Sequence, residues 1–108
     1  MKKTLCAVIL GLTSFSAFSY DGNDLYDWGR AWKADKGEAF KAGTYAGFVI
    51  GIDSSWTGLL FCPPSQTRNE QLFDIVLDYL KANPAKRTGI ASTVVVNALA
   101  EAYPCSKK

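Results

Sequence analysis

The chain has 108 residues, with 12 Lys and Arg, 10 Asp and Glu, three Cys and no His. This length supports one small domain and leaves little room for a second. The missing histidine removes the commonest general base and the commonest metal ligand. A formal charge of only +2 does not supply the concentrated basic face of a nucleic-acid-binding protein. The composition therefore favours an interaction protein over an enzyme.

Residues 1–19 have the features of a signal peptide. Two lysines open the chain, residues 5–12 are apolar, and small residues lead up to Ser19, where a signal peptidase would cut. The uncharged run of residues 4–20 is slightly short for a membrane span and no basic stop-transfer cluster follows it, so a retained anchor is the weaker alternative. We expect export to the periplasm, cleavage after Ser19, and a single domain over residues 20–108 that does not insert into the membrane.

The exported chain keeps two cysteines, Cys62 and Cys105. An even number of cysteines in an oxidising compartment indicates a disulfide, with two free thiols as the alternative. Closing the loop between them should stabilise so small a domain by about 4 kcal/mol, less any strain. Removal of the leader also removes two lysines and leaves equal numbers of basic and acidic residues.

The first expected helix runs from Asn23 to about Ala34. Asn23 is placed to cap it, acidic residues suit the positive end of the helix dipole, and apolar residues recur at helical spacing. Lys36 and Gly37 are expected to break the helix.

The second expected helix runs from about Glu38 to Trp56. Three glycines recur every fourth residue along it, at Gly43, Gly47 and Gly51. Each glycine costs about 1 kcal/mol of helix propensity. Close approach of another helix or of a second subunit would compensate for that cost, and a flexible or bent helix is the equal alternative.

The third expected helix begins with a capping box in which Thr67 is the cap and Glu70 reaches back. It is expected to run to about Ala82, after a loop over residues 57–66 that two adjacent prolines stiffen. The apolar residues of this segment recur at helical spacing, which indicates one buried face.

The fourth expected helix runs from Thr88 to about Tyr103. Residues 93–96 favour a strand by propensity, but the alanine-rich sequence around them favours a helix. A short connection makes the third and fourth helices antiparallel neighbours. That arrangement brings both cysteines to one end, so the sequence predicts an all-α fold, a small four-helix domain with one disulfide.

No catalytic or metal-binding constellation can be assembled from the sequence. Without histidine, neither a Cys-His nor a Ser-His pair can form. A polar helix end explains residues 53–55 better than an active site does, and a solvated face explains Asp74 and Asp78 better than paired catalytic carboxylates. There is no phosphate-binding glycine loop, Cys-x-x-Cys motif or calcium loop. We expect no catalytic residue, cofactor or metal.

Two proline-containing loops are the candidates for partner binding. Rigid loops lose little entropy on docking, and an arginine can contact a partner carboxylate through two hydrogen bonds. Ordinary helix connections are the alternative interpretation. The residues concerned are Pro63, Pro64, Ser65 and Gln66 in the first loop, and Asn83, Pro84, Lys86 and Arg87 in the second.

An ordered series of motifs carries a family resemblance. The series comprises Tyr45-Ala46-Gly47, Phe61-Cys62-Pro63-Pro64, Gln71, the segment Val76 to Pro84, Arg87, Ala98-Leu99, and Ala102-Tyr103-Pro104-Cys105. It resembles the Rap/Tai immunity family, small exported proteins that protect bacteria from type VI secretion amidase effectors. The match covers most of the exported chain.

The resemblance implies an all-helical periplasmic domain, often a homodimer, that binds a peptidoglycan-cleaving amidase and blocks its active cleft. It also implies that an exposed loop, here the one from Asn83 to Arg87, performs the blocking. Where other members carry an additional cysteine pair, this chain has Gly29 and Gly43, which leaves a single disulfide. The alternative is a periplasmic stress chaperone, or another small interaction protein of the same fold.

Overall fold

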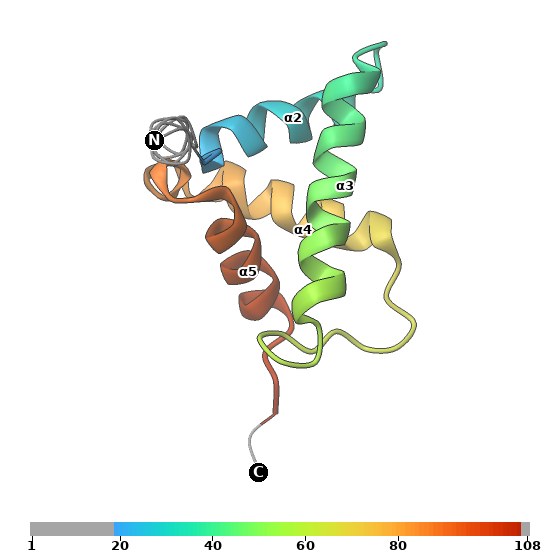
Figure 1. The fold of residues 1–108 in the computed structure, drawn as a ribbon, viewed down its shortest axis with the longest axis vertical. Coiled ribbons are helices and arrows are strands. Elements are labelled where there is room, and N and C mark those ends of the chain that lie inside the picture. Colours follow the sequence, from blue (N-terminus) through green and yellow to red (C-terminus); the bar gives the residue numbers. More distant parts are fainter. Residues whose placement is uncertain (1–18, 107–108) are drawn as a thin grey trace, which may run out of the picture.

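The computed structural model describes residues 19–106 and consists of helices joined by short loops (Figure 1). Within that part of the chain there is no β-strand and no helix long and apolar enough to cross a membrane. The predicted all-α class with four helices is confirmed, whereas the predicted signal sequence before residue 19 lies outside the described residues. The elements are α2 (Gly22–Ala34), α3 (Ala39–Trp56), α4 (Asn69–Ala82), the 3₁₀ helix η2 (Pro84–Thr88) and α5 (Ala91–Ala102).

Helix α2 is capped by Asp21 and not by Asn23 as the sequence suggested. The Asp21 carboxylate accepts from the backbone N–H of Asp24 at 3.0 Å, and the Asp24 carboxylate accepts from the N–H of Asp21 at 3.1 Å. This reciprocal pair satisfies two donors that a helix start leaves open. At the other end the chain leaves the helix through Asp35 and Gly37, both at positive φ, so the predicted break is confirmed.

Helix α3 has the predicted extent to within one residue. Tyr45 and Val49 on one of its faces are fully buried. The glycine row lies on the opposite side, and a Cβ added at Gly43, Gly47 or Gly51 would meet no described atom within 4 Å. The expectation that another helix of this chain packs on the row is therefore wrong.

Close packing requires glycine at two positions of α2, Gly22 and Gly29. A Cβ at Gly22 would lie 2.7 Å from the carbonyl oxygen of Arg87 in η2. A Cβ at Gly29 would lie 2.9 Å from Leu77 Cδ1 and 2.9 Å from Tyr45 Cε1. Such distances are shorter than carbon atoms tolerate, so only glycine lets α2 approach α3 and α4 this closely.

Helix α4 begins at Asn69, two residues after the predicted cap. The Thr67 hydroxyl donates to the carbonyl oxygen of Pro64 at 2.8 Å and so belongs to the preceding loop. The side chain of Gln71 accepts from the backbone N–H of Arg68 at 2.8 Å. The predicted Thr67–Glu70 capping box is wrong, because the hydroxyl is already used in the proline loop.

The connection between α4 and α5 is a 3₁₀ helix, which delays the start of α5 to Ala91. The strand-prone residues 93–96 are helical, as predicted. The two helices contain 14 and 12 residues and are steeply inclined to each other (Figure 1). The predicted antiparallel hairpin of these two helices is thus wrong. Residues expected at the start of α5 form η2 instead, and η2 turns the chain against α2, where the Gly22 N–H donates to Gly89 O at 2.9 Å.

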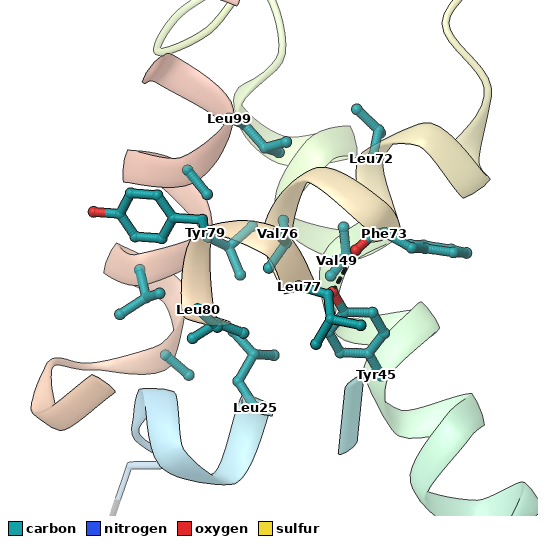
Figure 2. Packing of buried hydrophobic residues seen from close by; sticks show 14 of the residues in the cluster. Leu25, Tyr45, Val49, Leu72, Phe73, Val76, Leu77, Tyr79, Leu80 and Leu99 are labelled. Carbon is teal, nitrogen blue, oxygen red and sulfur yellow. Dashed lines mark hydrogen bonds between the residues drawn. The ribbon is translucent and has the colours of Figure 1, made fainter. Parts of the chain in front are cut away.

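Helix α4 runs through the centre of the core (Figure 2). Figure 2 shows the Tyr45 hydroxyl pointing at α4, where it donates to the carbonyl oxygen of Phe73 at 2.6 Å. Trp32 of α2 adds an edge-on contact with the Phe73 ring, with centroids 5.3 Å apart. Helix α4 buries Leu72, Phe73, Val76, Leu77, Tyr79 and Leu80.

The predicted disulfide between Cys62 and Cys105 is present, with their Cα atoms 4.8 Å apart. The Cys62 N–H also donates to the carbonyl oxygen of Tyr103 at 2.8 Å. The covalent bond and the hydrogen bond together fix the loop after α3 to the segment after α5. One end of the molecule is therefore anchored even though the helices that lead to it are not parallel.

Candidate partner-binding surfaces

The two loops predicted to bind a partner lie at opposite ends of α4 (Figure 1). A helix of 14 residues is about 21 Å long. The first loop precedes this helix and the second follows it, so the eight predicted residues form two surfaces instead of one. We call residues 56–68 with Cys105 the disulfide end, and residues 83–88 the η2 end.

A cleft of about 210 Å³ opens at the disulfide end, between the last turn of α3 and the proline loop. Three of the predicted binding residues line it, whereas Gln66 is exposed outside it. Its lining is mainly polar and comprises Asp53, Thr57, Pro63, Pro64, Ser65, Thr67, Asn69 and Leu72.

Asp53 carries the only formal charge among the residues that line this cleft. Partial burial raises the pKa of its carboxyl above the usual range, because desolvation disfavours the ionised form. Within residues 19–106 no cationic group pairs with this carboxylate, and the last turn of α3 contains no basic residue. In the sequence, residues 53–55 indicated only a polar helix end, and no pattern there predicted a cleft.

Beside the cleft, three large apolar side chains are exposed. The exposed fractions are 43% for Trp56, 71% for Leu59 and 46% for Leu60. The turn that carries them is ordered, because the N–H groups of both leucines donate to Trp56 O at 3.0 Å and the fully buried Phe61 anchors its end. This apolar surface was not predicted from the sequence, although two leucines directly after Gly58 in a loop were a signal for it.

At the η2 end, the polar side chains complete the fold. Arg87 Nε donates to Leu80 O at 2.7 Å, and the guanidinium carbon lies 3.9 Å from the centroid of the Tyr26 ring. The Asn83 amide donates to Tyr79 O at 2.9 Å. Arg87 thus satisfies a carbonyl group near the end of α4, whereas the Asn83 amide is a second donor to Tyr79 O, which already accepts from the Asn83 backbone N–H at 3.0 Å.

Two other predicted residues of the η2 end, Pro84 and Lys86, are exposed. Lys86 Nζ lies 5.6 Å from the centroid of the Tyr79 ring, which is a weak surface contact. A role in partner binding stays a prediction for all four residues at this end, and Lys86 is the one with a cationic group open to a partner.

The carboxylates of α4 do not form a catalytic pair. Asp74 accepts a hydrogen bond from Lys33 Nζ at 2.8 Å, and Asp78 is exposed one turn further along. In the described part of the chain, no three Cys, Asp or Glu side chains gather as metal ligands would. The surface features of the described residues include an acidic cleft, an apolar turn and a small basic end.

The fold and these surfaces define a small, single-disulfide helical domain equipped to bind another macromolecule. The sequence profile of the Rap1a immunity proteins matches residues 21–105, and the chain belongs to this family. The family resemblance found in the sequence is thereby confirmed, while no curated protein matches the chain. Membership implies that the partner is a toxin effector protein and that the role is of the generally non-enzymatic immunity type.

Proposed function

We propose that the protein is exported to the periplasm, where it inhibits a peptidoglycan amidase delivered by type VI secretion. The observation that carries this proposal is the match to Rap1a immunity proteins over almost the whole described chain. The disulfide between Cys62 and Cys105 supports an oxidising compartment. Inhibition requires only that the bound protein cover the active cleft, so that the peptidoglycan chain cannot enter.

The disulfide end is the surface best suited to this contact. An exposed tryptophan is typical of the anchors that dominate binding energy. The two leucines beside Trp56 add exposed apolar surface that a partner could bury. The disulfide and the two prolines reduce the conformational entropy that docking would cost. The η2 end, with Pro84 and Lys86, is the alternative blocking surface.

A second copy of the chain is the proposed neighbour of the outer face of α3. Phe40 on this face is 85% exposed, and the glycine row beside it has no side chains to keep another helix at a distance. A two-fold contact requires a surface that is complementary to itself, and an exposed ring next to a row of glycines meets that requirement. Sedimentation analysis of the wild type and of Gly47→Glu tests the homodimer, which the substitution should dissociate.

The test of function is coexpression of the mature protein with amidase effectors that are targeted to the periplasm. The wild type should restore growth and copurify with its effector. Leu59→Lys should abolish both effects, because it places a charge at the centre of the apolar turn, whereas Lys86→Glu at the η2 end should retain them. The opposite pattern would move the blocking surface to the η2 end.

Failure of the wild type to protect against, or copurify with, any amidase would refute the immunity role. A periplasmic stress chaperone is then the second candidate, favoured by the exposed Phe40 and Leu59. Suppression of client aggregation, compared between acidic and neutral pH, tests that role. A chaperone should protect several unrelated clients, while an immunity protein should protect none.

A further inference from the structure

The cleft at the disulfide end has the size of a single side chain. Its volume of about 210 Å³ lies below the roughly 300–1,000 Å³ of sites that bind whole small molecules. It lies next to the exposed apolar turn of Trp56, Leu59 and Leu60, since Thr57 belongs to both its wall and that turn. A protein that docks on the turn would therefore place one of its side chains at the cleft.

The charge of Asp53 is poorly compensated inside the molecule. Other half-exposed carboxylates have a partner: Asp27 lies 3.0 Å from Lys41 Nζ, and Asp74 lies 2.8 Å from Lys33 Nζ. Asp53 has no cationic partner among the described residues. Burial disfavours the charged form of its carboxyl. It also lies near the C-terminal end of α3, where the helix dipole disfavours negative charge. Groups kept in so unfavourable a place are typical of functional sites.

The missing partner is a cation with several donors. Thr57, Ser65 and Thr67 line the cleft together with Asp53 and carry hydroxyl oxygens that can accept hydrogen bonds, the Thr67 hydroxyl while it donates to Pro64 O. Leu72 supplies an apolar surface for an aliphatic stem. A calcium ion needs six to eight oxygen ligands, and no group of three acidic residues exists in residues 19–106 to supply them. An anion could approach the start of α4 at Asn69, but the Asp53 carboxylate would repel it.

We propose that this cleft binds an arginine side chain of the effector, with the guanidinium on the Asp53 carboxylate. The guanidinium carries five donors in a planar fork that matches a carboxylate and neighbouring hydroxyl groups. The inference that the arginine comes from an effector rests on the proposed immunity function. The chemistry of the cleft does not, and it can be tested on the protein alone.

The first experiment is an amide-detected NMR titration of the mature protein. N-acetyl-arginine amide should shift the signals of Asp53, Thr57, Ser65 and Asn69, whereas the neutral isostere N-acetyl-citrulline amide and the acidic N-acetyl-glutamate amide should not. Asp53→Asn should weaken binding of the arginine probe at least about threefold, which is a modest expectation for a partly exposed ion pair. The matched control Asp78→Asn, on the exposed side of α4, should bind the probe as the wild type does.

Equal shifts with citrulline or glutamate, or unchanged binding in Asp53→Asn, would overturn the arginine site. Saturable shifts of the same signals by calcium that displace the arginine probe would overturn it as well. Retained dispersion of the amide signals in Asp53→Asn shows that the variant is folded, so that a loss of binding reports on the carboxylate.

The second experiment uses an amidase that the wild type inhibits. Asp53→Asn should raise the dissociation constant of that complex by a factor of about 30 or more, because it leaves the effector arginine without its partner in the interface. Equal affinity of Asp53→Asn and wild type would refute the inference and leave the immunity role intact. If the wild type inhibits no amidase, the immunity role fails, while the probe titration still decides what the cleft binds.

Discussion

Arg87 was predicted from the sequence to contact a partner, and the structure gives it a task inside the fold. Its Nε donates to Leu80 O at 2.7 Å, Nη2 reaches Lys81 O at 3.4 Å, and the guanidinium stacks on Tyr26. The backbone of Arg87 is held separately, because Gly22 packs directly against it. Arg87→Ala therefore removes the side-chain contacts and leaves the path of the chain unchanged.

The expected loss is about 2–3 kcal/mol of the free energy of unfolding. The short hydrogen bond from a charged donor accounts for about 1.5–3 kcal/mol, and the bond at 3.4 Å adds little. Stacking over Tyr26 accounts for about 0.5–1 kcal/mol, and the two contributions are not fully additive. Arg87→Lys keeps the charge near the end of α4 and should recover about 0.3–1 kcal/mol.

Urea unfolding of the disulfide-bonded mature protein, followed by far-UV circular dichroism, measures the loss. With a slope of about 1 kcal/mol per molar urea, the midpoint of Arg87→Ala should fall by about 2 M. The matched control is Lys86→Ala, whose side chain is exposed and should cost less than about 0.5 kcal/mol. A midpoint for Arg87→Ala equal to that of Lys86→Ala would refute the structural role and return Arg87 to the interface.

Three further substitutions test the packing and the charges. Tyr45→Phe should lower the free energy of unfolding by about 1–2 kcal/mol, because it removes a buried hydrogen bond. Burial raises the pKa of the Tyr45 hydroxyl, so above about pH 10 this group ionises only in the unfolded chain and wild-type stability should fall. A pH series of unfolding midpoints should show a smaller fall in the variant. Gly29→Ala should lower the free energy of unfolding by about 1–3 kcal/mol, because its Cβ would collide with Leu77. Gly47→Ala places its Cβ in open space and should stabilise the monomer by up to about 1 kcal/mol. Equal thermal midpoints for the two variants would contradict both expectations. Asp53→Asn should raise the thermal midpoint at neutral pH, because it removes a charge that burial disfavours. The gain should vanish below about pH 4, where the wild-type carboxyl with its raised pKa is already protonated. A gain that persists in acid would show that the charge of Asp53 is not its cause.

The helices were predictable because the period of their apolar residues outweighs local propensity. Val94, Val95, Ala98 and Leu99 are all buried, and this spacing suits a helix whatever the β-branched residues prefer locally. The disulfide was predictable because the sequence after the predicted signal peptide contains only two cysteines. Neither inference needed knowledge of how the helices are arranged in space.

The errors concern residues whose role depends on distant partners. Several polar side chains near each helix start can act as the cap, and the one that caps α2 is Asp21, which also pairs with Ile90 from a distant part of the chain. The glycine row on α3 attracts attention in the sequence, yet the tight packing is at Gly22 and Gly29 of α2, whose neighbours come from η2, α3 and α4. Spacing along one helix does not show which other segment a glycine will meet.

The same reasoning separates the two ends of α4 as binding surfaces. Both loops contain proline, which made both of them candidates in the sequence. In the structure, the two ends of α4 differ in which side chains are left without a partner. Arg87 has its donors and its aromatic partner within the fold, so a partner protein would gain little from it. Asp53 has no cation among the described residues, and Leu59 has no apolar cover. Because a partner stabilises a complex through the groups that folding leaves uncompensated, the disulfide end is the better candidate for the interface.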